Sequence, residues 1–358
     1  MVMSMYDYLK TIYESGIIQE LGFLDGIYQL NSQKELLFDE LINDDNWCLE
    51  IIRTNLDFKS KNFQINKAYA YRFKHIVICW LLGIGCIEFV NPNMKYNILF
   101  QKTWQLSAFT HDYGWFCEET FDNPQEDFLN SFGDYYLLKD DYKLPILSCL
   151  HNYIIENSNL IPFSYETIKN YYFKSIEYHR KEKERGNMDD KETCDHGIVG
   201  GCLAFKEYTE YLENRKQIED GRSIVEMNKA ACLITASHNI WGEQIRKENG
   251  LLSIMALVDT IECTKLFSSY DKANRLYPLI KWQTLYTRIK LEINKDSLMI
   301  DLNDLSKYIE SKKGDKFGII KRKFDKYWNS LKTIDSWTPF SVISDENEGK
   351  SIIFYSRK

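Results

Sequence analysis

Histidines and aspartates stand in apolar surroundings at six positions of this chain. The histidines that lie in or beside apolar segments with helical spacing are His75, His111, His196 and His238. Asp112 directly follows His111, and Asp259 lies within the apolar run LLSIMALVDTIE. A buried carboxylate or imidazole needs a partner, because an unpaired charge in a protein core is costly. Histidine and aspartate side chains drawn from several helices are the ligands that a divalent metal requires, so we expect these residues to bind metal.

The order of these residues along the chain resembles that of the HD-domain metallohydrolase superfamily. The adjacent pair His111 and Asp112 matches the signature doublet of that superfamily. His75, on the preceding apolar helix, matches its first histidine, and Asp259 matches the terminal aspartate of its last core helix. The resemblance covers about residues 71–267, which is more than half of the chain.

His196 and His238 resemble the two additional histidines of the dinuclear branch of that superfamily. The resemblance therefore implies two divalent transition-metal ions, and a mixed set of histidine and carboxylate ligands suits Mn, Fe, Co, Ni or Zn. The implied ligands of the first ion are His75, His111, Asp112 and Asp259. The implied ligands of the second ion are His196 and His238, with Asp112 bridging the pair.

The function that this resemblance implies is metal-dependent hydrolysis of a phosphate ester. Two ions about 3.5–4 Å apart bind a phosphate between them and supply hydroxide at neutral pH. Asp112 is then the catalytic residue that bridges the ions and orients the hydroxide, and the partner is a phosphorylated small molecule or nucleotide. Two alternatives stay open, a mixed-valent di-iron oxygenase of the same superfamily and a regulatory or binding protein that has lost activity.

Three cationic residues are candidates for substrate binding. Arg72 lies one helical turn before His75, and Lys265 lies six residues after Asp259. Arg180 lies near the start of a charged segment, residues 179–195, that has almost no apolar anchor and is expected to be a mobile flap. Glu262 is expected to form a surface salt bridge rather than to contact substrate, and His151 is assigned to packing.

The elements that must position these residues are predicted to be mainly helical. Residues 1–70 form an N-terminal extension of short helices, and residues 71–283 form the HD domain. Residues 284–358 alternate like strands around a helical stretch with Gly314 as a break, which predicts a small α+β domain of order β-β-α-β-β. The expected fold class is therefore mainly α, an HD-domain helical bundle with these two additions.

The overall composition narrows the choice of partners and of compartment. The 358 residues carry a net charge of −7, so neither nucleic acid nor an anionic membrane is indicated as a partner. The longest apolar stretch, Ile76–Ile87, is too short to span a bilayer. The nine cysteines include no CxxC pair, and the polar start of the chain lacks a secretory signal, so a cytoplasmic location is expected. The oligomeric state stays open.

Overall fold

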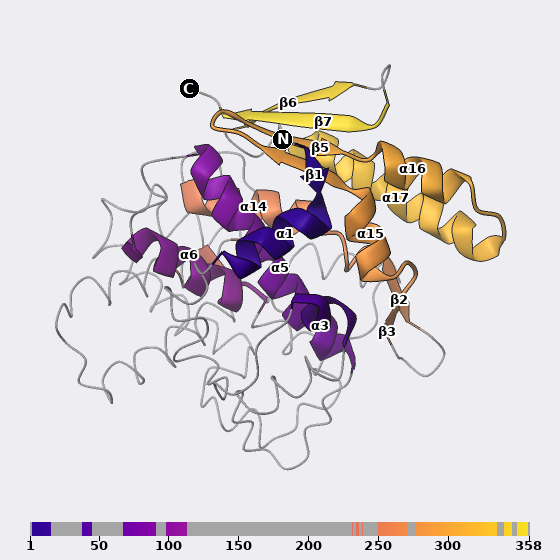
Figure 1. The fold of residues 1–358 in the computed structure, drawn as a ribbon, viewed down its shortest axis with the longest axis horizontal. Helices are drawn as coiled ribbons and strands as arrows, with labels where there is room; N and C mark the ends of the chain where they lie inside the picture. The colour runs from indigo at the N-terminus through magenta and orange to yellow at the C-terminus, as the bar shows by residue number, and fades with distance from the viewer. Residues whose placement is uncertain are drawn as a thin grey trace, which may run out of the picture. The chain divides into compact units, whose positions relative to one another are not determined.

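The computed structural model of the chain is shown in Figure 1. It describes residues 2–15, 38–44, 67–90, 98–112, 231, 234–235, 238, 250–270, 276–334, 340–345 and 349–356. The chain divides into two compact units. The first comprises Met1–Asp57, Gln64–Gln101 and Ser253–Lys358, and the second comprises Phe58–Phe63 and Lys102–Leu252.

The first unit contains a five-stranded antiparallel sheet in the order β1-β4-β5-β7-β6. Its strands are β1 (Met3–Ser4), β4 (Lys290–Ile293), β5 (Ser297–Asp301), β6 (Phe340–Asp345) and β7 (Ser351–Ser356). Alternate residues of a strand point to opposite faces, and Leu298, Ile300, Ile352 and Phe354 are all buried. One face of the sheet therefore belongs to the core, and the register confirms it by pairing Ile300 with Ile352 and Leu298 with Phe354.

Helix α5 (Lys67–Val90) contacts β4 and β5 of this sheet. It is apolar on nearly every side, as expected of a helix that is buried all round. Near its end the ring of Phe89 stacks on Phe340 of β6, with 5.4 Å between the ring centroids. The apolar stretch Ile76–Ile87, predicted as a buried core helix, lies within α5 and is buried at every position.

Two further helices come from the first 70 residues. Helix α1 (Met5–Glu14) begins at Ser4, whose hydroxyl accepts a hydrogen bond from the backbone of Asp7 at 3.0 Å. It contacts α5, α15 and the short helix α3 (Phe38–Asn43). Short helices were predicted here, and α1 and α3 agree with that expectation within the part of the segment that the structure describes.

The remaining elements of the first unit follow one another along the C-terminal third of the chain. They are the hairpin β2 (Ser268–Tyr270) with β3 (Leu276–Pro278), and the helices α15 (Trp282–Arg288), α16 (Asn303–Glu310) and α17 (Asp315–Thr333). Gly314 precedes α17 with a φ of 107°, a conformation that favours glycine, and separates it from α16 as the sequence predicted. Helix α17 buries residues at spacings of three and four, which is the pattern of an amphipathic helix.

Two helices run across the division between the units, α6 (Ile98–Thr110) and α14 (Gly250–Ile261). Within the second unit, Thr110 at the end of α6 and Thr235 are joined by a hydrogen bond of 2.6 Å between their hydroxyls. Among the helices that the structure describes, none has both the length and the apolar character needed to cross a membrane.

The predicted fold class, a mainly α HD-domain bundle with a small C-terminal α+β domain, is wrong. The five-stranded sheet is not confined to the C-terminal segment, because β1 at the start of the chain pairs with β4. The hairpin of β2 and β3 adds two strands in a region that was predicted to be helical. Residues 285–288 were predicted as strand but close α15, since Trp282, Leu285 and Tyr286 are buried at helical spacing.

Candidate metal centre

His75 is the central residue of the candidate site in the first unit. Helix α5 carries it, and its side chain is fully buried. Its Nδ1 lies 2.5 Å from Oε2 of Glu262, and its Nε2 lies 3.1 Å from Oδ1 of Asp259. Both carboxylates belong to α14 or to the residue that follows it. The imidazole is thus held between two carboxylates, one at each ring nitrogen.

Glu262 is buried, and its carboxylate accepts hydrogen bonds from several neighbouring donors. Its Oε1 accepts from the backbone N–H of Thr264 at 2.9 Å and from the hydroxyl of Tyr286 at 2.6 Å. Its Oε2 accepts from the Thr264 hydroxyl at 2.7 Å in addition to His75 Nδ1. The sequence predicted a surface salt bridge for Glu262, but Tyr286 of α15 lies over it and His75 lies beside it.

The electrostatics of the pair favour the charged form of both groups in the absence of metal. Burial raises the pKa of Glu262, but the hydrogen bonds and charge of His75, together with those from Tyr286 and Thr264, outweigh burial and hold this pKa below its ordinary value. Burial and the charge of Lys265 lower the pKa of His75, whereas its hydrogen bonds to Asp259 and Glu262 raise it, and the net direction is upward. Burial and the charge of Glu262 raise the pKa of Tyr286 well above its usual range, so its hydroxyl stays a donor.

Asp259 lies at the rim of this cluster, where its side chain is 32% exposed. The Lys265 ammonium lies 3.4 Å from the same oxygen of Asp259 that faces His75. Cys79 is one turn after His75 on α5, with its sulfur 3.7 Å from either ring nitrogen. One donor atom from each of His75, Cys79 and Asp259 lies within 4.8 Å of the other two, a spacing that could hold a metal ion.

The second unit brings together His111, Asp112 and His238. His111 and Asp112 directly follow α6, and all three side chains are buried. The Nε2 atoms of His111 and His238 lie 3.9 Å and 4.0 Å from Oδ1 of Asp112. The two imidazole rings meet at 89°, with 5.2 Å between their centroids. The second unit thus places two histidine nitrogens around one carboxylate oxygen.

The backbone fixes the protonation of these two rings. His111 Nδ1 lies 2.6 Å from the carbonyl oxygen of Ala108, and His238 Nδ1 lies 2.7 Å from that of Thr235. A carbonyl oxygen can only accept, so each Nδ1 carries the proton in these contacts and donates it. A neutral imidazole protonated at Nδ1 has its lone pair at Nε2, the atom that faces Asp112.

The predicted site residues fall into three groups. The structure brings His75 and Asp259 together in the first unit, and His111, Asp112 and His238 together in the second. Lys265 contacts Asp259, while Arg72 is half-buried one turn before His75. His196, Arg180, His151 and the segment 179–195 lie outside the described residues.

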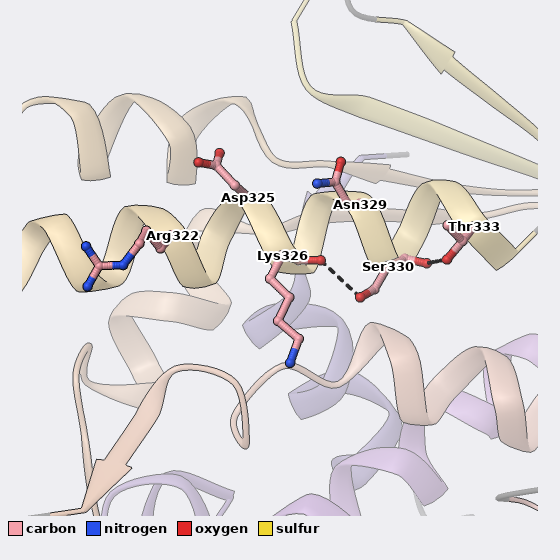
Figure 2. A pocket seen from close by; sticks show the side chains of 6 residues that line it. All are labelled: Arg322, Asp325, Lys326, Asn329, Ser330 and Thr333. Carbon is pink, nitrogen blue, oxygen red and sulfur yellow. Dashed lines mark hydrogen bonds between the residues drawn. The ribbon is translucent and has the colours of Figure 1, made fainter. Parts of the chain in front are cut away.

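A hollow on the surface of α17 is shown in Figure 2. It is lined by Arg322, Asp325, Lys326, Asn329, Ser330 and Thr333. Asp325 and Asn329 point to one side of the helix and Lys326 to the other, and the Ser330 hydroxyl donates to the backbone of its own helix at 3.0 Å. These side chains do not converge on a common point, so this hollow is not the candidate site.

Comparison with known proteins adds no identification. No protein-family model matches the chain, and searches among curated proteins and among solved structures found no significant match. The resemblance to the HD-domain superfamily therefore stays a prediction from the order of the ligand-type residues.

Two contributors to the first-unit cluster, Cys79 and Tyr286, were missed from the sequence, and Glu262 was given a surface role. Cys79 follows His75 at a spacing of four residues, which places both on one face of a helix and could have revealed it. Glu262 follows Asp259 by three residues and carried the same signal. Tyr286 had no signal, because its segment was interpreted as a strand.

Proposed function

We propose that the chain is a metal-dependent hydrolase of phosphate esters that binds two divalent transition-metal ions. The substrate class is a phosphomonoester or phosphodiester, such as a nucleotide. One observation carries the proposal: His75, His111 and His238 share the same arrangement. In each of them the Nδ1–H donates a hydrogen bond to an oxygen, and Nε2 faces the carboxylate of an aspartate.

That arrangement is the one by which proteins orient histidine ligands. Metal-binding histidines commonly donate their second ring N–H to a carboxylate or a backbone carbonyl, which fixes the tautomer and aims the other nitrogen. The separations of 3.9 Å and 4.0 Å between Nε2 and Asp112 are too long for hydrogen bonds. They are short enough for two ligands of one ion, since bonds of about 2.1 Å allow a separation of up to about 4.2 Å.

The chemistry of the donors supports a transition metal. Imidazole nitrogen with carboxylate oxygen suits Mn, Fe, Co, Ni or Zn better than Mg or Ca, and the sulfur of Cys79 would favour the softer members of that group. When bound, two such ions supply hydroxide at neutral pH and balance the charge of phosphoryl oxygens. Asp112 orients the donors of its unit, and the Lys265 ammonium, 36% exposed, is available to attract an anionic ester beside Asp259.

The assignment of ligands to each ion follows the order of the residues in the sequence. We assign the first ion to His75, His111, Asp112 and Asp259. We assign the second ion to His196 and His238, with Asp112 shared. We also infer a cytoplasmic location, which is supported by the buried thiols of Cys86 and Cys263, because a reducing compartment preserves thiols.

The test begins with metal-free protein reconstituted separately with Mn, Fe, Co, Ni and Zn. Bound metal is counted by mass spectrometry, and phosphate or alcohol release is followed on aryl phosphomonoesters, aryl phosphodiesters and nucleotides. We expect two ions per chain and hydrolysis that His75→Ala and His111→Ala abolish. Asp325→Asn, which changes an exposed carboxylate of α17, should leave both properties as in the wild type.

Two results would contradict the proposal. The first is a rate of hydrolysis, zero included, that does not change when any of the metals is added. The second is oxygen consumption by the iron-loaded protein without phosphate release, which would instead favour a di-iron oxygenase.

A further inference from the structure

We propose that Glu262 is a positioning residue that holds His75 in the Nδ1–H tautomer and so aims Nε2 of this ligand at the metal. The inference rests on the proposed function in one respect, that His75 binds metal. It assigns Glu262 a role distinct from that of Asp259, although both carboxylates contact the same imidazole.

The acceptor capacity of Glu262 separates the two carboxylates. An ionised carboxylate has about four lone-pair sites for hydrogen bonds. Glu262 accepts from the Thr264 backbone and the Tyr286 hydroxyl at Oε1, and from the Thr264 hydroxyl and His75 at Oε2. All four sites are occupied by donors of the protein, which leaves none for a metal ion or a substrate.

Asp259 has the opposite surroundings. Its side chain is 32% exposed at the rim, and its Oδ1 lies 3.1 Å from His75 Nε2. Two ligands of one ion can have this separation, because it is below twice the usual bond length of about 2.1 Å. The geometry therefore points to Asp259 and His75 as ligands of one ion and to Glu262 as the group behind the imidazole.

The fold holds Glu262 in this place from three directions. Its backbone N–H donates to Val258 at 2.8 Å and continues the hydrogen-bonding of α14. Thr264, two residues on, donates to both carboxylate oxygens, and Tyr286 donates from α15. A buried carboxylate fixed in this way can orient His75 without moving when an ion binds.

The alternative is a buried ion pair with a purely structural role. Removing one partner of such a pair destabilises the fold whether or not a metal is near. The two roles predict different effects on metal binding when Tyr286, a neighbour of Glu262, is changed. Tyr286 donates to Oε1, the oxygen that does not contact His75, so Tyr286→Phe weakens the support of Glu262 while the contact to the imidazole stays.

The experiment compares zinc affinity, measured by competition with a chelator, in the wild type, Glu262→Gln and Tyr286→Phe. We expect Glu262→Gln to weaken the binding of one ion by about 10–100-fold, the usual effect of losing such an outer hydrogen bond. Tyr286→Phe should lower the stability against urea but change zinc affinity by less than about threefold. Equal losses of affinity in the two variants, or wild-type affinity in Glu262→Gln, would overturn the proposal.

A second measurement reads the protonated ring nitrogen in the wild type itself. Long-range ¹H–¹⁵N spectra of the zinc-loaded wild type report which ring nitrogen of His75 carries the proton, with His75→Gln supplying the assignment. We expect a proton on Nδ1 and zinc on Nε2. A proton on Nε2 would overturn the role of Glu262 while leaving metal-dependent hydrolysis intact, whereas a wild type that binds no zinc or other tested metal would refute both proposals.

Discussion

The three described histidines of the site reach their orientations by different means. His111 and His238 donate to the backbone three residues earlier, so local chain geometry alone fixes their rings. His75 depends on Glu262, which is 187 residues away in the sequence. The orientation of His111 and His238 therefore requires only local structure, whereas that of His75 requires α5, α14 and α15 to be packed together.

The number of bound ions provides a test at the residue scale. If His196 and His238 bind the second ion, then replacing either with Ala should remove mainly one of two ions. Hydrolysis should fall by more than the 10–100-fold that loss of an outer hydrogen bond typically causes. Asp112→Ala should have a larger effect, since a shared carboxylate serves both ions. Metal analysis that finds one ion in the wild type, with no loss in His196→Ala or His238→Ala, would return both histidines to structural roles.

The Cys86 thiol gives a prediction on the pH dependence of stability. Burial raises its pKa from 9.0 to about 12 in the folded chain. Because the folded pKa lies above the unfolded one, the contribution to stability is complete below pH 9.0 and is lost as the pH rises toward 12. Above pH 9.0 the free energy of unfolding should fall by about 1.4 kcal/mol per pH unit from this group.

Cys86→Ala isolates that effect from the other groups that titrate at high pH. The variant loses the packing of a buried sulfur at every pH, but it also lacks the thiol whose titration lowers the stability of the wild type above pH 9.0. Its free energy of unfolding in urea, measured under reducing conditions from pH 8 to 10.5, should therefore approach that of the wild type as the pH rises. A difference between the two proteins that stays constant over this range would show that the thiol does not titrate as expected.

Residue types alone were enough to select His75, His111, Asp112, His238 and Asp259 from the sequence. Polar residues in apolar helical segments are rare enough to stand out, and the structure places them in two local groups. Glu262 was expected at the surface, because its burial depends on Tyr286, and the position of Tyr286 depends on α15 packing. The burial of a residue that is covered by a distant element cannot be seen in its own segment.

At the scale of elements, helix α5 approaches its neighbours closely at Gly85. A Cβ at this position would overlap the hydroxyl of Tyr8 in α1 and would lie 2.7 Å from Cδ1 of Ile293 in β4. Both neighbours come from elements that contact α5, so Gly85 lets helix and sheet approach each other. The glycine is needed for packing rather than for an unusual φ.

Gly85→Ala should therefore destabilise the protein although alanine favours helices. The gain in helix propensity is about 1 kcal/mol, and overpacking of a core typically costs about 1–3 kcal/mol. Gly318 in α17 is the matched control, because nothing lies within 4 Å of a Cβ placed there. Gly318→Ala should raise the free energy of unfolding by about 0.5–1 kcal/mol.

Adding Tyr8→Phe to Gly85→Ala removes the nearest overlapping atom. Thermal and urea unfolding of the four proteins of this cycle should show that the double variant recovers part of the lost stability. Additive effects, or a stabilising Gly85→Ala, would mean that α1 and β4 are not packed on α5 at this point.

The strands near the C-terminus were easier to predict than the sheet they form. Leu298, Ile300, Ile352 and Phe354 alternate with more exposed residues, a period that is visible in the sequence. The two residues of β1 are too few to show any period, so the strand that joins the start of the chain to the sheet could not be found. The wrong fold class followed largely from this short strand and from the hairpin of β2 and β3.

At the scale of the whole molecule, α1 links the N-terminal residues to the C-terminal sheet. Met5 donates its backbone N–H to Ile289 at 2.6 Å, and Leu9 is fully buried. Leu9→Ala should lower the free energy of unfolding by about 2–4 kcal/mol. Lys10→Ala, which removes exposed ion pairs to Glu14 and Asp39, should cost less than about 1 kcal/mol.

Hydrogen exchange shows whether the destabilisation by Leu9→Ala reaches the sheet. Peptides that cover β4 and β5 should exchange faster in Leu9→Ala than in the wild type, and at the wild-type rate in Lys10→Ala. Unchanged exchange in β4 and β5 of a destabilised Leu9→Ala would mean that α1 unfolds separately from the sheet.

The pairing of β1 with β4 also sets the order in which the protein can fold during synthesis. Met3 and its partner Leu291 are separated by 288 positions along the chain. A ribosome that adds about 5–20 residues per second needs about 15–60 s to make that stretch. During this time Met3 and Ser4 have no strand to pair with, and α5 emerges before the strands that it packs against. Chaperones that shield apolar helices on nascent chains would have their main opportunity in this interval.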